Sequence, residues 1–320
     1  MIRYYHLEDG KIKPSRGTEL NRITWCDALQ PTDNEMIEIA QKFNINLDDL
    51  EDCMEESERP RYNYDVLLKN NFLILHVVHS AEFDISQSPT VPMGIFLTSQ
   101  GKLLTVHPTL PRHFENMIDI LGRQNIKDTY YLLLEIAHFF FDQLDNMAQQ
   151  LARNVRQMQT RILKSRNVGD IQEPFQVNSY LIMFITSVLG NTNAFKLFYH
   201  KNSGYFEKNL ELLEKYNDNQ TDIEQIYAFT SIIRDVLANS LDAYGGVINN
   251  NLSQIMKVVG SISLILMIPT IIASFYGMNV GLPGGGDPEG GNPIPFYFVI
   301  AVSFAISFAI WIFFRKNKWL

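Results

Sequence analysis

Two uncharged stretches near the C-terminus place the strongest constraint on how this chain can fold. Val258–Tyr276 contains no charged residue over 19 positions, and Phe296–Phe314 is a second uncharged run of 19 residues. At ~1.5 Å of rise per residue, such a helix is about as long as the ~30 Å hydrocarbon core of a bilayer. We therefore predict a multi-pass membrane protein with two C-terminal transmembrane helices, at about 258–276 and 296–314.

Basic residues flank the two runs only at the ends away from the connecting loop. Lys257 precedes the first run, and Arg315, Lys316 and Lys318 follow the second. The connecting loop, 280–295, has no Lys or Arg but carries Asp287 and Glu289. Because positive charge collects on the cytoplasmic side, both termini are expected in the cytoplasm, and the protein in the cell (inner or plasma) membrane.

The predicted secondary structure before the membrane hairpin changes near residue 125, from mixed strands and helices to long helices. Residues 1–125 mix short apolar strands such as 70–79 with helical patterns, and Thr32 with Glu35 is a capping box. This composition predicts a cytosolic α/β sandwich domain. Residues 126–217 contain two long helical patterns that should pair as a hairpin, with a turn at 167–170.

A third helix is expected to be much longer than the others. Asp218–Asp222 is rich in N-capping residues, and from there no proline interrupts the chain until Pro269. We predict a stalk over 218–279 that includes the first transmembrane segment. Residues 280–295 then form the outer loop and 315–320 a basic cytosolic tail.

A polar stripe runs along this predicted stalk. Ten successive positions, three or four residues apart, carry no Leu, Ile, Val or aromatic side chain. They are Asp242, Gly246, Asn249, Ser253, Met256, Gly260, Ser263, Met267, Thr270 and Ser274. A ~3.5-residue period is typical of helices packed around a common axis, so a ring of such helices would line a water-filled pore.

One alternative and one further role apply to parts of the stripe. Small residues such as Gly260 and Ser263 also allow close packing of two membrane helices. Met256 and Met267, with Val259 one step off the stripe, would narrow a pore and could gate it by dewetting.

Other function classes have little support in the sequence. The formal net charge is -8, whereas a nucleic-acid-binding protein is normally basic. The two cysteines, Cys26 and Cys53, form no CxxC pair, and no nucleophile lies in a pattern with a base. We expect neither an enzyme nor a nucleic-acid partner.

The end of the first membrane segment resembles a known family. Tyr276-Gly277-Met278-Asn279 matches the GMN signature of the CorA family of divalent-cation channels. Pro31-Thr32, Glu58–Arg61 and the terminal Lys318-Trp319-Leu320 match it as well, so the resemblance covers essentially the whole chain.

This resemblance implies a homopentameric funnel in the lipid bilayer that passes Mg²⁺, and also Co²⁺ or Ni²⁺. Tyr276, Gly277, Met278 and Asn279 would form the selectivity ring at the outer mouth. Neutral amide oxygens suit hydrated Mg²⁺, which gives up its waters reluctantly.

The resemblance also implies regulation by cytosolic Mg²⁺ bound between subunits. Asp218 occupies a position similar to one such acid, and Glu82 or Asp84 are candidate partners. Asp287 and Glu289 would attract cations outside, although LPGGGDPEGG departs from the acidic MPEL-like loop of the family. Arg315, Lys316 and Lys318 would form a basic ring around the stalk helices.

The predicted fold class is thus an α+β membrane protein that assembles into a homopentamer. Two other functions stay open at this point. One is a Zn²⁺ transporter of the same superfamily, with or without proton coupling. The other is a membrane-tethered cytosolic sensor domain, which would need neither a polar stripe nor a second membrane helix.

Overall fold

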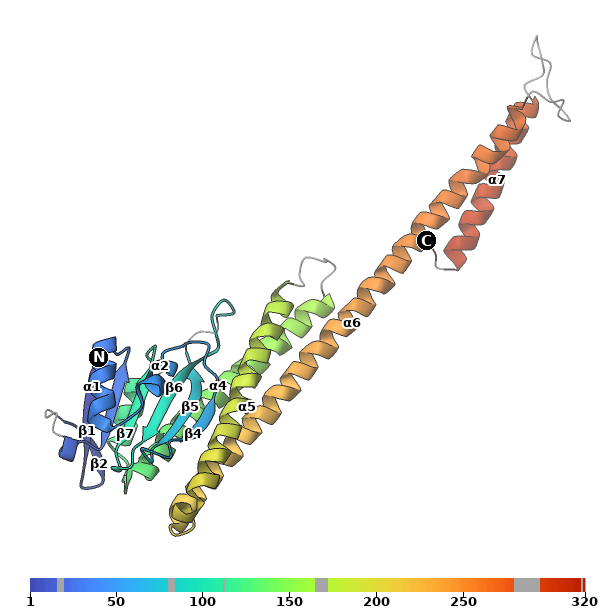
Figure 1. The fold of residues 1–320 in the computed structure, drawn as a ribbon. Helices are drawn as coiled ribbons and strands as arrows, with labels where there is room; N and C mark the ends of the chain where they lie inside the picture. The colour runs from blue at the N-terminus through green and yellow to red at the C-terminus, as the bar shows by residue number, and fades with distance from the viewer. Residues whose placement is uncertain are drawn as a thin grey trace. The chain divides into compact units, whose positions relative to one another are not determined.

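The structure is a computed structural model that describes residues 1–15, 20–79, 84–111, 113–164, 172–278, 294–317 and 319. The chain divides into two compact units, Met1–Ser240 and Leu241–Leu320. Figure 1 labels the elements. The predicted turn at 167–170 lies outside the described residues.

The first unit is built on a seven-stranded sheet. Its spatial order is β2 (Lys11–Pro14), β1 (Ile2–Glu8), β3 (Trp25–Leu29), β7 (Leu103–His107), β6 (Thr90–Leu97), β5 (Asn71–Val78) and β4 (Arg61–Tyr64). Only β3 and β7 run parallel, and the other neighbours are antiparallel. The strand β5 lies where the sequence predicts a strand, at 70–79.

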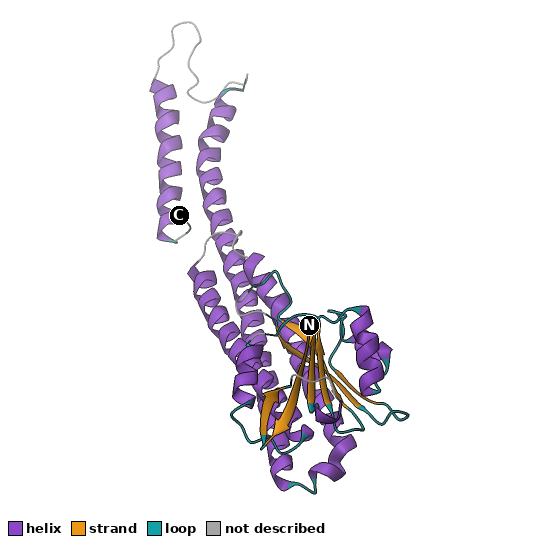
Figure 2. Ribbon diagram, turned by 90° about the vertical axis from the view of Figure 1, so that its left-hand side faces the viewer, coloured by secondary structure: helices purple, strands orange, loops and turns teal. Residues whose placement is uncertain are grey.

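Helices cover both faces of the sheet, which confirms the predicted α/β sandwich (Figure 2). On one face, α1 (Asp33–Phe43) and α2 (Leu47–Asp52) share a core cluster with Phe72 and Ile74 of β5. The alternate residues Leu73 and Leu75 are equally buried, on the face that α4 (Thr129–Lys164) and α5 (Gln172–Phe206) cover. Coverage on two faces explains why these strands are apolar throughout instead of alternating.

The helix α1 begins as predicted. The Thr32 backbone N–H donates to the Glu35 carboxylate at 2.8 Å, and the Glu35 N–H donates to the Thr32 hydroxyl at 3.4 Å. The remaining short elements are the 3-10 turn η1 (Leu20–Arg22) and α3 (Phe114–Leu121), which packs against α4.

The long third helix begins earlier than predicted. α6 spans Leu210–Tyr276, and Asn209 caps it by accepting the N–H of Leu212 at 3.3 Å. The predicted start at Asp218–Asp222 is therefore wrong. The reason is Asn219, which is buried and donates to the Leu134 carbonyl of α4 at 2.9 Å. Asn219 resembles a helix N-cap in the sequence, but it lies inside α6 and makes a buried contact with α4.

Hydrogen bonds at His76 of β5 connect α5 to the sheet. The pairing of β4 with β5 ends at Arg61 and Ile74, so His76 has no partner on β4. The Asn191 side chain of α5 instead accepts the N–H of His76 and donates to its carbonyl, both at 2.8 Å. The imidazole Nε2 donates to the Glu58 carbonyl at 2.7 Å. Burial of the ring lowers the pKa of His76 below its usual value.

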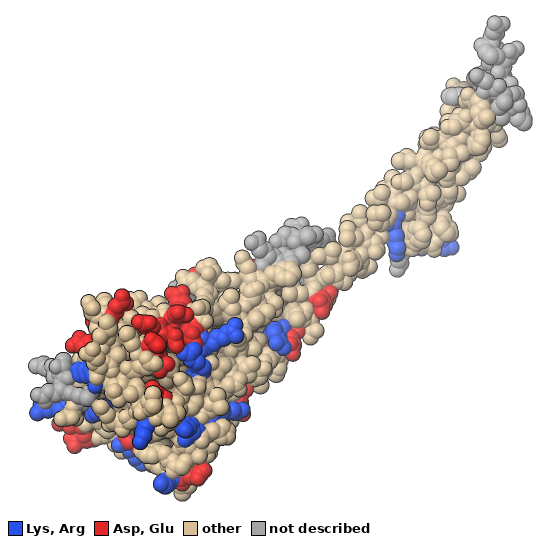
Figure 3. Space-filling view, in the orientation of Figure 1, with Lys and Arg blue, Asp and Glu red and all other residues tan. Residues whose placement is uncertain are grey.

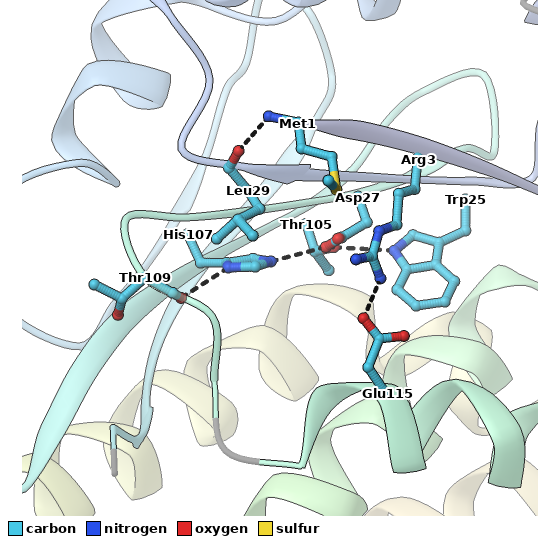
Figure 4. A network of polar contacts seen from close by, with 9 residues as sticks. All are labelled: Met1, Arg3, Trp25, Asp27, Leu29, Thr105, His107, Thr109 and Glu115. Atoms are coloured by element: carbon cyan, nitrogen blue, oxygen red, sulfur yellow. Dashed lines mark hydrogen bonds and ion pairs between the residues drawn. The ribbon is translucent and has the colours of Figure 1, made fainter.

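A second buried polar network joins β3 to β7 (Figure 4). Both the Thr105 hydroxyl, at 2.6 Å, and the His107 Nε2, at 2.9 Å, bond to one carboxylate oxygen of Asp27. The Trp25 indole N–H donates to Thr105, and His107 Nδ1 donates to the Thr109 carbonyl. Asp27 is therefore the common acceptor of this network.

We predict that Asp27→Ala destabilises the first unit by about 3 kcal/mol, because it leaves the buried Thr105 hydroxyl and His107 Nε2 without a partner. Thermal unfolding of the detergent-solubilised protein, followed by near-UV circular dichroism, measures the loss. The matched control is Arg3→Ala, which removes the solvent-exposed ion pair with Glu115 and should cost under about 1 kcal/mol. Equal losses for the two variants would contradict the central role of Asp27.

Candidate functional site: the membrane hairpin and its polar seam

Three helices are long and apolar enough to cross a membrane, judged by length and composition among the described residues. Two are α6 and α7 (Ile294–Lys316), which include the predicted spans. The third is α5, whose most apolar window is 56% buried inside the first unit. The apolar residues of α5 therefore pack in the core of the first unit, consistent with the contacts of α5 with β4 and β5.

In the second unit, α7 runs antiparallel to the end of α6 and covers only one of its faces (Figure 2). Ser261 is buried, and Ile265, Ile268, Pro269 and Ile272 are half-buried. These positions recur at steps of three or four residues, with Ile268 and Pro269 adjacent, and so form a single face. On α7, Ser303 and Ser307 are buried, so small hydroxyl residues mediate the close contact between the helices.

A proline within α6 gives this contact a specific hydrogen bond. Pro269 has no N–H, so the carbonyl of Ile265, four residues earlier, loses its helical donor. The Ser307 hydroxyl donates to that carbonyl at 3.3 Å. Because an unsatisfied carbonyl is costly in hydrocarbon, Ser307 compensates for Pro269. This pair is not among the contacts predicted from the sequence, although a proline inside an uncharged run signals a carbonyl that needs a donor.

The polar stripe predicted from the sequence lies on the face of α6 opposite α7. All ten predicted positions from Asp242 to Ser274 are solvent-exposed, as is Val259 beside them. We call this face the seam. The close-packing alternative fails within one chain, because α7 packs on Ser261 and not on Gly260 or Ser263.

The same 3.5-residue spacing continues N-terminally along α6, where the positions turn gradually around a straight helix by ~20° per heptad. Nine further positions in the first unit are exposed, and they are Glu211, Glu214, Asp218, Thr221, Gln225, Ala228, Ile232, Asp235 and Asn239. Together with Asp242, the seam carries acids at five positions and no Lys or Arg. Glu211 and Glu214 are not among the residues predicted from the sequence, because the predicted helix begins only at Asp218.

The GMN motif follows the end of α6 directly. The Gly277 N–H bonds the Ala273 carbonyl at 3.0 Å, the Met278 N–H approaches the Phe275 carbonyl at 3.4 Å, and Tyr276 and Met278 are exposed. Asn279 lies outside the described residues, as do Asp287, Glu289 and Lys318.

The residues proposed for regulation are only partly described. Asp218 is exposed on α6, and the Asp84 carboxylate accepts the N–H of Ser86 at 2.9 Å and its hydroxyl at 2.7 Å. These hydrogen bonds lower the pKa of Asp84. Glu82 lies outside the described residues. Among the residues that are described, no three His, Cys, Asp or Glu side chains converge as they would around a metal ion.

Basic and aromatic residues gather at one end of the hairpin. The contact of Ser307 with Ile265 sets the register, which places Lys257 level with Arg315. The Arg315 guanidinium lies 5.2 Å from the centre of the Trp311 ring, and Phe314 stacks on Trp319. Elsewhere the hairpin is almost free of charge on the face seen in Figure 3, whereas Lys, Arg, Asp and Glu are scattered over the first unit. This pattern is typical of a membrane interface.

Comparisons with known proteins agree with these features. Residues 21–316 match the family model described as CorA-like Mg²⁺ transporter protein. The cobalt/magnesium transport protein CorA of Methanocaldococcus jannaschii is 23% identical, and the match covers 98% of each chain.

Solved structures share the fold. The complete structure of the CorA magnesium transporter from M. jannaschii matches 100% of this chain and 99% of that one, with a TM-score of 0.82 and 20% identity. The ZntB cytoplasmic domain from Vibrio parahaemolyticus covers 78% of this chain and 97% of its own, with a TM-score of 0.62 and 13% identity.

We predict that Ser307→Ala weakens the α6–α7 pairing by about 0.6 kcal/mol, a typical value for a hydrogen bond between membrane helices. In a Pro269→Ala background the same change should cost almost nothing, because residue 269 then supplies the N–H to Ile265. Unfolding by sodium dodecyl sulfate in mixed micelles, followed by tryptophan fluorescence, measures both steps of this double-mutant cycle. Equal costs in the two backgrounds would show that Ser307 does not compensate for Pro269.

Proposed function

We propose, on the premise that this chain belongs to the CorA-like Mg²⁺ transporter family, that five copies form a channel that conducts Mg²⁺ into the cell. The family is one of membrane metal-ion transporters, which its description names as such. The proposal includes the pentamer, the ion pathway, the selectivity ring and the gate.

The observation that carries the proposal is the exposed seam of α6. Within the span of hydrocarbon length it presents Gly260, Ser263, Thr270 and Ser274, while α7 occupies the opposite face. Hydroxyl groups that face lipid gain no partner there. Thr270 partly compensates by donating to the Leu266 carbonyl at 3.1 Å. A ring of α6 helices would turn the seam inward, where water hydrates the remaining polar groups.

Charge along the seam suits cations. Asp218, Asp235 and Asp242 would form rings of carboxylates in the cytosolic part of the pathway, and the membrane part carries no charge. At the other end, the C-terminus of α6 has a partial negative charge from its free carbonyls. Both ends of the pathway therefore attract divalent cations without a tight site within the membrane, as rapid release requires.

The gate is proposed at the two methionines of the seam. Met256 is 69% and Met267 54% exposed in the single chain, so a ring of five copies would bring them together on the axis. Val259 lies beside them. Such a constriction excludes water when narrow and conducts when the helices separate.

The selectivity ring is assigned to Gly277, Met278 and Asn279, beside Tyr276. Five amide oxygens would bond the waters around Mg²⁺ instead of replacing them, because Mg²⁺ dehydrates reluctantly. Co²⁺ and Ni²⁺ would pass by the same route. Asp287 and Glu289 would raise the cation concentration outside.

Regulation is proposed to need a neighbouring subunit. Asp218 is exposed and Asp84 is half-buried, so carboxylates from two subunits could share one Mg²⁺, with Glu82 as another candidate. Two carboxylates repel each other until a cation neutralises them, which would couple cytosolic Mg²⁺ to closure.

The membrane topology follows from the basic end of the hairpin. Lys257, Arg315 and Lys316 would lie on the cytoplasmic side of the cell membrane, and both termini would then be cytoplasmic. With Lys318 they would form a basic ring around the α6 helices.

The two other functions, a membrane tether and a Zn²⁺ transporter, have less support. A membrane tether would not need the exposed seam, and the family description names a transporter. Transport of Zn²⁺ has only a fold likeness at 13% identity in its favour. The described seam has no carboxylate or histidine between Asn249 and Ser274, which argues against proton coupling.

Cysteine substitution tests the pathway. Cys26 and Cys53 are both buried, so an introduced cysteine would be the main accessible thiol. We predict that a charged thiol reagent blocks Mg²⁺ uptake into proteoliposomes for Ser263→Cys. It should not block uptake for the matched control Ile262→Cys, which is exposed but lies off the seam. Block of both variants, or of neither, would exclude the seam as the pathway.

Substitution of Asn279 tests selectivity separately. We predict that Asn279→Ala reduces Mg²⁺ uptake by roughly tenfold or more, because the ring loses the amide oxygens that hold hydrated Mg²⁺. Ser253→Ala, on the seam but outside the motif, is the control and should retain uptake. Parallel assays with Zn²⁺, with and without a pH gradient, identify the ion. Unchanged Mg²⁺ flux in Asn279→Ala would overturn the assignment of the ring.

A further inference from the structure

A cavity of about 500 Å³ lies between α3 and α4 in the first unit. Its size falls within the ~300–1,000 Å³ range of small-molecule sites. It is remote in sequence from the seam and the GMN motif, and the proposed function assigns it no role. Its walls come from one face of α4 and from the facing side of α3 and the residue before it.

The α4 wall is lined with polar groups that can bond a ligand. Gln143, Asn146, Gln150 and Arg153 recur every three or four residues, so they share one face of the helix. Gln143, Gln150 and Arg153 make no side-chain hydrogen bond or ion pair to any other residue that the structure describes. Amide groups offer both donors and acceptors, and a guanidinium offers donors in a planar fork.

The charge of this wall is unusual for the chain. No Asp or Glu is among the described residues that line the cavity, although the chain has a net charge of -8. Arg153 supplies a permanent positive charge, and His113 and Asn116 face it from α3 and its N-cap. The cavity is therefore suited to an anion, and its guanidinium matches the geometry of a phosphate.

The other end of the cavity is apolar. Phe139 and Ile120 line it, and Phe139 lies two turns before Asn146 on the same face of α4. A neighbouring hollow of about 190 Å³ shares these two residues and contains Glu135 and Asp142. Phosphate would be repelled at this end, so it must lie at the Arg153 end. Phe139 can contact a planar ring, and Gln143 can bond the polar edge of that ring.

We propose that this cavity is a binding site for a nucleoside polyphosphate. The base lies against Phe139 and Ile120, the amides of Gln143 and Asn146 bond its edge, and Arg153 binds the phosphates. Phe139 and Arg153 are 14 residues apart, or ~21 Å along the helix axis, which suits an extended ligand. Binding here is independent of ion conduction.

Fluorescence anisotropy tests this proposal with the full chain in detergent, in Mg²⁺-free buffer that contains a chelator. The probe is an ATP analogue with a fluorophore on its ribose, and unlabelled ATP and inorganic triphosphate are the competitors. We expect saturable binding that ATP displaces, and weaker displacement by inorganic triphosphate because it lacks the base. Arg153→Ala should weaken binding by about tenfold or more, since it removes the charge-assisted hydrogen bonds.

Two variants make the test specific. Arg156→Ala removes an exposed arginine of the same helix that does not line the cavity, and it should leave binding unchanged within about twofold. Gln143→Ala should weaken the displacement by ATP but not that by inorganic triphosphate. The melting temperature of each variant confirms folding. Absence of saturable binding, equal effects of the two arginine variants, or equal displacement by ATP and triphosphate would overturn the proposal.

Discussion

The constraint on which the membrane part of this protein depends is the need to satisfy polar groups where no water is available. α6 places glycine, serine and threonine along a face of hydrocarbon length, and α7 covers only the opposite face. A single hairpin therefore leaves the seam facing lipid, which offers its hydroxyls no hydrogen bonds. Assembly around the seam would resolve the conflict, so the proposed ion pathway and the proposed oligomer answer the same physical requirement.

The same requirement explains the contact between α6 and α7. Pro269 removes a donor from the backbone ladder, and Ser307 supplies one from the neighbouring helix. Ser261 and Ser303 are small enough to let the helix backbones approach. The hairpin thus has two faces with different tasks. One holds α7 through small residues and a backbone hydrogen bond, and the other remains open for contacts that one chain cannot provide.

The first unit shows how surroundings decide the role of an apolar helix. α5 is apolar enough to pass for a membrane span, yet more than half of that window is buried in protein. Asn191 within it bonds the backbone of His76 at the end of the β4 pairing, which ties the helix to the sheet. Buried amides and hydroxyls on this helix have protein partners, whereas the polar residues of the seam have none on other helices of the chain's described part. Hydropathy does not distinguish the two cases, because it records composition and not partners.

The sequence by itself determined the two hydrophobic spans, the α/β domain, the capping box at Thr32 and the period of the seam, because these depend on spacing along the chain. It also placed the GMN motif, which carries the family resemblance. Only the tertiary structure decided where α6 begins, because Asn219 looks like a cap and is a buried contact to α4. It likewise decided which face of α6 remains open, since that depends on where α7 packs. Ser307 and Ile265 are 42 residues apart, and no local pattern joins them; their contact is visible only when the two helices lie side by side.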